Sequence, residues 1–372
     1  MNVPKLRFKE FNDEWEEIEL SNITSEISYG MNASSKEYDG ENKYIRITDI
    51  DEGTNKYIHK SIVSPDGDLE EKFLVKENDI LFARTGASTG KTYLYDKNDG
   101  KLYYAGFLIK ANIINHNANF IFQQTKLNKY NSWVRIMSMR SGQPGINSQE
   151  YGNYKFSITS PEEENKIAKF LSLLDKKIEL QSKKVEDLKL FKKGLSNNIF
   201  NNMKDFKEYK LGDLCNITTG KLDANAMVEN GKYRFYTCAK EYSFIDEYSF
   251  DTEALLISGN GAYVGYIHYY NGKFNAYQRT YVLDQFSQNI QFIKCYLDEN
   301  LSRRIKSEKK EGNTPYIVLS TLSDMIIKVP SKENQRNISN IINYHQRKIL
   351  LEQNKLNKLK ELKKGLMQKM FV

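Results

Sequence analysis

Apolar residues recur at alternating intervals of four and three in two stretches of the chain, residues 163–200 and 334–371. This spacing is a heptad pattern, which gathers the apolar side chains in one seam along a helix. The first seam consists of Ile167, Leu171, Leu174, Ile178, Val185, Leu188, Leu195 and Ile199. The second seam consists of Ile338, Ile342, Ile349, Leu356, Leu359, Leu366 and Met370. The pattern predicts two long helices, each of which buries its seam against a partner.

The residues that begin each stretch suit a helix N-terminus. Ser160 can cap free backbone N–H groups, Pro161 fits the first helical position, and the glutamates at 162–164 favour the positive end of the helix dipole. Ser331 and Glu333 begin the second stretch in a similar way. A helix of about 38 residues extends about 57 Å, which is too long to fold back within one small domain. We therefore expect the two helices to pair as an antiparallel coiled coil, with a globular unit at each end.

Polar residues interrupt both seams at matched positions. Gln181 and Lys192 break the first seam, and Glu352 and Lys363 break the second at the equivalent places. Polar groups at seam positions often fix the register of a coiled coil and its choice of partner. Further apolar residues lie off the seams, and they are Phe170, Leu180, Leu190, Ile341, Leu350 and Leu362. A second apolar face indicates a further protein partner, although the pattern alone is equally compatible with a simple dimerisation stalk.

The two helices belong to an internal repeat that runs through the whole chain. At a constant offset of 171, Lys192-Lys193-Gly194-Leu195 matches Lys363-Lys364-Gly365-Leu366 without a gap. Weaker matches precede the helices, and they are Ile27–Gly30 with Ile217–Gly220, Lys43-Tyr44 and Thr48 with Lys232-Tyr233 and Thr237, and Gly86–Gly90 with Gly261–Gly265. The sequence predicts a tandem duplication with pseudo-twofold character. Its expected segments are a globular domain at 1–160, a helix at 161–203, a globular domain at 204–330 and a helix at 331–372.

The globular units have the pattern of mixed α/β domains, so that the whole chain is of the α+β class. Short stretches rich in Tyr, Ile and Phe, such as 44–47 and 276–282, predict strands, and Gly, Asn, Asp and Lys between them predict turns. The loops are rich in Ser, Thr, Asn, Gln, Arg and Lys. Side chains of these types match the hydrogen-bond donors and acceptors on base edges in DNA.

Charge and composition allow a nucleic-acid partner and exclude several other classes. The 372 residues carry a net charge of +7 at pH 7 and include 25 tyrosines. The three cysteines are Cys215, Cys238 and Cys295; they form no CxxC pair and argue against a disulfide framework or a structural zinc ion. The four histidines have no metal-ligand spacing. Because the chain has no long apolar run and begins without a secretory signal pattern, we expect a cytoplasmic protein with no membrane contact.

With this organisation the chain resembles the specificity subunits of type I restriction-modification systems. The resemblance covers essentially the whole length and depends on the ordered duplication. Its strongest elements are Trp15-Glu16 to Leu20, Tyr209-Lys210-Leu211-Gly212-Asp213-Leu214, and the paired Lys-Lys-Gly-Leu helices. Similar too are Asn78-Asp79-Ile80-Leu81 with Arg84-Thr85-Gly86, and Gly142-Gln143-Pro144-Gly145-Ile146-Asn147.

The resemblance implies a mechanism without a catalytic centre or cofactor in this chain. Each globular unit would be a target-recognition domain that reads one half of a bipartite, asymmetric double-stranded DNA site. The helices would set the gap between the halves and dock two modification subunits, which bring S-adenosylmethionine and methylate adenines. Restriction subunits, which are ATP-dependent endonucleases, would be additional partners in some assemblies.

Candidate DNA contacts are polar, basic and aromatic residues in loops at equivalent places of the two copies. In the first copy they are Tyr29, Arg46, Thr48, Arg84, Thr85, Ser88, Thr89, Lys91, Arg140, Ser141, Gln143 and Asn147. In the second they are Thr219, Lys221, Thr237, Lys240, Asn260, Tyr263, Arg279, Asn313, Thr314 and Tyr316. Lys and Arg are expected on phosphates, whereas Gln143, Asn147, Asn260 and Asn313 are expected on base edges. For each arginine taken singly, a surface ion pair is the competing interpretation.

Three short motifs resemble catalytic signatures; we interpret residues 86–92 and 65–72 as loops and residues 313–316 as no methyltransferase centre. Residues 86–92 resemble a phosphate-binding loop but have three residues between the glycines instead of four, and the second copy has Tyr266 in place of the lysine. Residues 313–316 resemble an adenine methyltransferase motif, and residues 65–72 a nuclease motif with cramped spacing. The alternatives to DNA recognition are a coiled-coil scaffold whose globular ends bind proteins and, ranked third, a fused methyltransferase.

Overall fold

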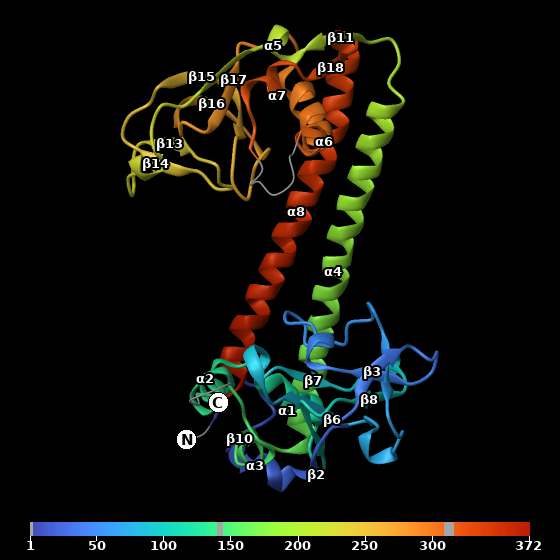
Figure 1. Ribbon diagram of the computed structural model, residues 1–372. Coiled ribbons are helices and arrows are strands. Elements are labelled where there is room, and N and C mark those ends of the chain that lie inside the picture. The colour runs from blue at the N-terminus through green and yellow to red at the C-terminus, as the bar shows by residue number, and fades with distance from the viewer. Residues whose placement is uncertain (1–2, 140–143, 309–315) are drawn as a thin grey trace. The chain divides into compact units, whose positions relative to one another are not determined.

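The computed structural model describes residues 3–139, 144–308 and 316–372, and it contains two long helices and two globular domains (Figure 1). The long helices are α4 (Pro161–Asn201), drawn in green, and α8 (Lys332–Met370), drawn in red. The chain forms two compact units, of which unit 1 comprises residues 1–180 and 355–372 and unit 2 residues 181–354. Each unit therefore contains one globular domain and part of both long helices. The predicted pair of long helices and the duplicated mixed α/β architecture are confirmed.

The globular domain of unit 1 is built around a four-stranded antiparallel sheet of order β2-β9-β6-β7. Its strands are β1 (Glu16–Glu19), β2 (Thr24–Tyr29), β3 (Ser34–Glu37), β4 (Lys43–Ile45), β5 (Val63–Asp66), β6 (Asp79–Ala83), β7 (Thr92–Leu94), β8 (Leu102–Tyr104), β9 (Leu108–Ile113) and β10 (Lys155–Ile158). Its helices are α1 (Ala118–Gln124), α2 (Asn128–Met137) and α3 (Ser148–Gly152), and short 3-10 turns lie at Leu20–Ile23, Ile47–Asp49, Glu71–Phe73, Gly86–Ser88 and Lys97–Asp99. Three two-stranded pairs complete the domain: β1 with β10, β3 with β5, and β4 with β8.

The central strand β6 separates two hydrophobic cores in unit 1. Successive side chains of a strand point to opposite faces, so that Ile80 and Phe82 pack on one side and Leu81 and Ala83 on the other. The larger core also contains Phe120 of α1 and side chains from both long helices. The start of α4 and the end of α8 are therefore part of the domain core.

Unit 2 contains one six-stranded sheet of order β12-β17-β15-β16-β13-β14. The strands of this unit are β11 (Lys207–Lys210), β12 (Asn216–Thr219), β13 (Tyr233–Tyr236), β14 (Ser243–Ile245), β15 (Phe250–Ser258), β16 (Ile267–Ala276), β17 (Thr280–Asp284) and β18 (Ile326–Val329). Its helices are α5 (Leu211–Leu214), α6 (Ile290–Glu308) and α7 (Leu319–Ser323), with a 3-10 turn at Ala224–Ala226. Leu255 and Ile257 of β15 pack in a core with α6, and Leu256 lies in a separate core on the other face.

Backbone contacts define which residues of the two domains correspond. The first strand pairs antiparallel with the last strand before the long helix in both, as β1 with β10 and β11 with β18. A Cβ atom on Gly30 would lie 2.3 Å from the carbonyl oxygen of Ala105, and one on Gly220 would lie 1.8 Å from that of Ala276. The predicted match of these two glycines thus reflects a shared close approach of two backbones, which only glycine allows.

One sequence match is wrong by two residues. We matched Lys43-Tyr44 to Lys232-Tyr233, but Ala105 donates its N–H to Ile45 whereas Tyr277 donates to Tyr236. Ile45 therefore corresponds to Tyr236, and Arg46 rather than Thr48 corresponds to Thr237.

Both helices present their predicted seams to each other within each unit. Residues such as Ile167, Leu171, Val185, Ile342 and Ile349 are buried, and the remaining predicted seam positions are buried or partly exposed. The pairing is antiparallel, since Gln181 of α4 contacts Glu352 whereas Lys192, further along α4, contacts Gln346, which comes earlier in α8.

The matched polar positions pair across the seam. The Gln181 amide donates to the Glu352 carboxylate at 2.8 Å. The Lys192 ammonium lies 2.9 Å from the Gln346 side-chain oxygen, and Lys363 lies 2.5 Å from Asp175. With the offset of 171 these last two pairs are equivalent to each other. The predicted register-setting role of the polar breaks therefore has a concrete basis in the structure.

The start of each long helix is tied to its domain by a fully buried side chain. Glu164 accepts hydrogen bonds from the backbone N–H of Asn117 at 2.9 Å and of Thr159 at 3.3 Å. Its equivalent, Gln335, accepts from the N–H of Asn289 at 3.0 Å. Neither long helix is apolar enough to cross a membrane, nor is any other helix in the described ranges.

Candidate nucleic-acid interface

The same glycine-bounded turn follows the central strand in both domains. Gly86 and Gly90 have φ angles of +74° and +88°, and Gly261 and Gly265 have +78° and +80°. The N–H of Gly90 donates to Ala83, as that of Gly265 does to Ser258. These positive φ angles favour glycine at all four positions. The glycines therefore shape a turn between two strands, in agreement with our interpretation of residues 86–92 as a loop.

A second segment closes against this turn in each domain. In unit 1 the Gly86 N–H donates to Pro144 at 2.9 Å and the Ile146 N–H donates to Arg84 at 2.9 Å. In unit 2 the Ile317 N–H donates to Gly259 at 2.7 Å, and Asn260 pairs with Tyr316 in an isolated bridge. Residues that are about 60 apart in sequence thus form one surface in each domain.

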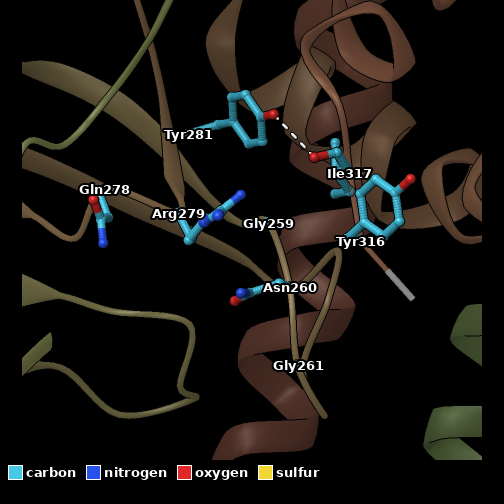
Figure 2. Close-up of a pocket in the computed structure, with 8 residues that line it drawn as sticks. All are labelled: Gly259, Asn260, Gly261, Gln278, Arg279, Tyr281, Tyr316 and Ile317. Atoms are coloured by element: carbon cyan, nitrogen blue, oxygen red, sulfur yellow. Dashed lines mark hydrogen bonds between the residues drawn. The ribbon is translucent and has the colours of Figure 1, made fainter. Parts of the chain in front are cut away.

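In unit 2 this surface encloses a cavity of about 380 Å³ (Figure 2). It is lined by Gly259, Asn260, Gly261, Gln278, Arg279, Tyr281, Tyr316 and Ile317. The Tyr281 hydroxyl donates to the Ile317 carbonyl at 3.0 Å, the dashed line in Figure 2, and so holds the second segment against the sheet. The predicted residues Asn260, Arg279 and Tyr316 are brought together here.

In unit 1 the equivalent surface carries an arginine stacked on a tyrosine. The guanidinium carbon of Arg84 lies 4.7 Å from the ring centre of Tyr29. The Tyr29 hydroxyl accepts hydrogen bonds from the backbone N–H and the hydroxyl of Ser148, at 3.1 and 3.0 Å. Burial opposes ionisation of Tyr29, but the bonds from Ser148 and the charge of Arg84 together lower its pKa below the ordinary value. The predicted Tyr29 and Arg84 therefore form one positioned group.

Internal partners also hold the predicted contacts Arg46, Lys91 and Asn147. Arg46 makes a two-pronged ion pair with Asp49, at 2.8 and 2.9 Å. Lys91, whose side chain is 13% exposed, points its ammonium at the Ile50 carbonyl 3.1 Å away. Asn147 caps α3 through its side-chain oxygen. These interactions argue against Arg46 and Lys91 as phosphate contacts.

The other predicted residues fall into three sets. Thr48, Thr219, Lys221, Lys240, Tyr263 and Tyr316 are exposed, and Thr85, Ser88, Thr89 and Thr237 are partly exposed. The Lys240 ammonium lies 5.2 Å from the ring centre of Tyr263, and the Thr89 hydroxyl donates to Gly86 within the turn. Arg140, Ser141, Gln143, Asn313 and Thr314 lie outside the described residues.

Three residues on or near these surfaces were not predicted. Gln278 is exposed next to Arg279, and Phe107 is 63% exposed. Arg234 lies between the rings of Tyr242 and Tyr270, at 4.3 and 4.5 Å from their centres. A self-comparison at an offset of 172 would have aligned Phe107 with the predicted Arg279.

The described residues contain no group of His, Cys, Asp and Glu side chains able to hold a metal ion. The three cysteines are free. Burial raises the pKa of Cys215 to about 12 and that of Cys295 to about 11, so that both thiols stay protonated at neutral pH.

A second candidate surface consists of exposed apolar residues on each of the long helices. Exposed apolar residues occur on both helices at the same offset of 171, and they are Phe170, Leu173, Leu180 and Phe191 on α4 and Ile341, Tyr344, Leu351 and Leu362 on α8. Their spacings of three, seven and eleven residues keep them on one side of a helix. The predicted Leu190 and Leu350 are exposed as well, but Phe191 and Leu351 are the repeated positions. We call these eight residues the outer stripes.

Comparison with known proteins agrees with this duplicated arrangement. The model of the type I restriction modification DNA specificity domain matches the chain twice, over residues 12–190 and 203–361. The type I restriction enzyme EcoDI specificity subunit of Escherichia coli is 40% identical over 131 residues, which are 35% of this chain and 29% of that protein. A type I specificity subunit of Mycoplasma pneumoniae is 28% identical over 144 residues, 37% of this chain and 39% of that protein. The matches thus span well under two thirds of either relative.

Solved structures show the same fold over nearly the full length. The S subunit of the type I restriction-modification system from M. genitalium is similar with a TM-score of 0.71 at 18% identity, over 100% of this chain and 99% of that one. A chain from a structural study of type I R-M complex assembly has a TM-score of 0.55 at 15% identity, over 96% and 97%. Because its two globular domains and most of its long helices match the family model, the chain belongs to the type I restriction-modification DNA specificity family.

Proposed function

We propose that the two globular domains each bind one half of a split, asymmetric DNA site. The observation that carries this proposal is the surface of glycine turn and closing segment, which has the same backbone in both domains but different side chains. A shared backbone with different side chains suits two readers of the same polymer that recognise different bases. The net charge of +7 favours the phosphate backbone.

The long helices would determine the gap between the half-sites. They contain 41 and 39 residues, and each is one uninterrupted helix. The polar pairs Gln181–Glu352, Lys192–Gln346 and Lys363–Asp175 hold their register. Removing seven residues from each helix at equivalent places should change the gap and leave both half-sites unchanged.

The outer stripes would dock two modification subunits. Two equal stripes on one chain suit two copies of the same partner, because each copy meets the same apolar positions. In this assembly the modification subunits would carry S-adenosylmethionine and this chain no cofactor. Restriction subunits would be further partners, and the complex would act in the cytoplasm.

The direct test is modified-base sequencing of DNA from cells that express this chain with its modification subunit. Methylated adenines in one split, asymmetric motif are expected, and they should vanish when this chain is omitted. If no modification occurs while the same modification subunit works with another specificity subunit, the proposal fails and a coiled-coil scaffold becomes the better description.

A further inference from the structure

A short turn joins two strands of each domain and presents different side chains in the two copies. In unit 1 the turn spans 105–108, where the Leu108 N–H donates to the Ala105 carbonyl at 2.8 Å. In unit 2 it spans 277–280, where the Thr280 N–H donates to the Tyr277 carbonyl at 2.8 Å. Both are β-turns closed by the hydrogen bond between their first and last residues. The central residues are Gly106-Phe107 in the first and Gln278-Arg279 in the second.

Two further backbone bonds show that the turns occupy the same place. The Gly106 N–H donates to Met31 at 2.7 Å, and the Gln278 N–H donates to Leu222 at 2.9 Å. The Phe107 carbonyl accepts from Arg84 at 3.0 Å, just as the Arg279 carbonyl accepts from Gly259 at 2.9 Å. Arg84 and Gly259 each lie two residues before the first glycine of the glycine turn. Phe107 and Arg279 are therefore structurally equivalent, and both lie beside the candidate interface.

The side chains at these positions have no evident role within their own domain. Phe107 is 63% exposed, so that its ring is largely in contact with water. Arg279 is exposed, and its guanidinium forms no hydrogen bond or ion pair with any residue in the described ranges. By contrast Arg46, in the other domain, is bound to Asp49 through both prongs of its guanidinium. The unpaired guanidinium of Arg279 leaves its donors free for a ligand, and Phe107 presents an exposed ring at the equivalent position.

The surroundings of Arg279 favour a base edge over a phosphate. Gln278 and Asn260 line the same cavity as Arg279, so that two amides share this surface with the guanidinium (Figure 2). Arginine matches the O6 and N7 acceptors of guanine with two parallel bonds, and amides match adenine in a similar way. An apolar ring has no such bonds to offer, but it can contact the methyl group of thymine in the major groove.

We propose that these two turns are specificity determinants, with Arg279 reading a guanine in one half-site and Phe107 contacting a thymine methyl group in the other. This inference rests on the proposed function, because it assumes that both domains bind DNA. It assigns the asymmetry of the target to one equivalent position, where one domain offers a hydrogen-bonding fork and the other an apolar ring.

The test is selection from a randomised duplex DNA library by the full chain in complex with its modification subunits. Arg279→Lys is the decisive variant, since it keeps the charge but removes the fork. The preference for guanine at one position should fall on the order of tenfold or more, while the other half-site is unchanged. Phe107→Ala should lower the preference for thymine over cytosine at one position of the other half-site about fourfold, as expected for one buried methyl group. Arg336→Lys and Leu69→Ala, which make the same kinds of exchange at exposed positions elsewhere, should leave the motif unchanged.

The possible outcomes separate this inference from the proposed function. If the unaltered chain selects a split motif but Arg279→Lys keeps its guanine preference, or weakens binding equally on all sequences, the specificity role of Arg279 is overturned and the proposed function stands. The specificity role of Arg279 is also overturned if the half-site bound by unit 2 contains no guanine. If the unaltered complex selects no motif, both proposals fail together.

Discussion

The two places where the domains join their long helices look alike in backbone but differ in charge. In unit 1 three donors surround the carboxylate of Glu164: the N–H groups of Asn117 and Thr159 and the Nδ1 atom of His116, which lies 2.9 Å away. A carboxylate can only accept, so that a glutamate satisfies this site. Glu163 next to it accepts two bonds from Arg7, both at 2.7 Å. The joint of unit 1 is therefore ionic.

The joint of unit 2 has one donor and two acceptors around the equivalent side chain. Gln335 accepts from Asn289 and uses its amide to donate to the Pro330 carbonyl and the Gln288 side chain, both at 2.9 Å. Pro330 stands where unit 1 has Thr159, and proline has no N–H to donate. An amide, which both donates and accepts, satisfies this site without charge. The comparison teaches that the identity of the buried residue follows from the donors and acceptors that face it.

Breaking the ionic joint should have the largest effect. Glu163→Ala leaves the Arg7 guanidinium, 12% exposed, and the hydroxyl of Thr159 without their shared partner, which should destabilise unit 1 by about 3–5 kcal/mol. Both tryptophans, Trp15 and Trp133, lie in unit 1, so that tryptophan fluorescence during urea unfolding reports on this unit alone.

The matched control for this variant is Asn334→Ala, since Asn334 is the equivalent residue of α8 and is exposed. A surface change of this kind should alter stability by less than about 0.5 kcal/mol. Equal effects of the two variants would show that the buried ion pair contributes nothing particular to unit 1.

Exchanging the two joint residues should have the next largest effect, and an unequal one. Gln335→Glu places a carboxylate against the Pro330 carbonyl in a fully buried site and should cost about 3 kcal/mol. Glu164→Gln keeps the bond from Asn117 and should cost about 1 kcal/mol. Hydrogen exchange of the amides at the start of α6 and of α1 would measure the two effects separately. A larger loss for Glu164→Gln than for Gln335→Glu would contradict the donor and acceptor argument.

Acid should weaken the joint of unit 1 and spare that of unit 2. Although burial raises the pKa of Glu163, the hydrogen bonds from Arg7 and Thr159 outweigh it and hold this pKa below its ordinary value. A lowered folded-state pKa gives stability that is complete above the unfolded pKa of about 4.3 and is lost as the pH falls through the folded value. Tryptophan fluorescence should therefore show unit 1 unfolding more readily as the pH falls below about 4.3. Unchanged acid sensitivity in Glu163→Gln would rule out this carboxylate as the cause.

The helices were predictable because their signal is local. Heptad spacing fixes which face of a helix is buried, and it was sufficient to predict the burial of Leu171 in the first seam and of Ile349 in the second. The glycine turns were predictable for a similar reason, since the residues at 86–90 and 261–265 repeat within five positions. The same reasoning placed Glu163 and Glu164 at the helix start but could not show that Arg7 and His116 bury them.

The candidate interface was only partly predictable because it depends on contacts between strands that are distant in sequence. The structural equivalence of Phe107 and Arg279 follows from the backbone bonds that each accepts, from Arg84 and from Gly259. In the sequence, insertions change the offset between the two copies and so hide this equivalence. A free arginine and a paired one look the same in a sequence. Only the structure distinguishes Arg279, which has no partner in the described ranges, from Arg46.

The smallest effects are expected from two lysines of the candidate interface, one in each domain. We predicted a phosphate contact for Lys91, but its ammonium points inward to the Ile50 carbonyl, and unit 2 has Tyr266 at the equivalent position. Lys240 is exposed and lies over Tyr263. Lys91→Ala should therefore lower the stability of unit 1 by about 1 kcal/mol and leave the dependence of DNA binding on salt unchanged.

Lys240→Ala should weaken binding about equally on all sequences and reduce the slope of log affinity against log salt by about 0.9, as expected for one lost phosphate contact. Binding of both variants to one duplex across a salt series would measure the two slopes side by side. Because Lys91 and Lys240 carry the same charge, a difference between their slopes reports where each ammonium lies relative to the DNA. A reduced slope for Lys91→Ala would show that its side chain turns outward when DNA binds.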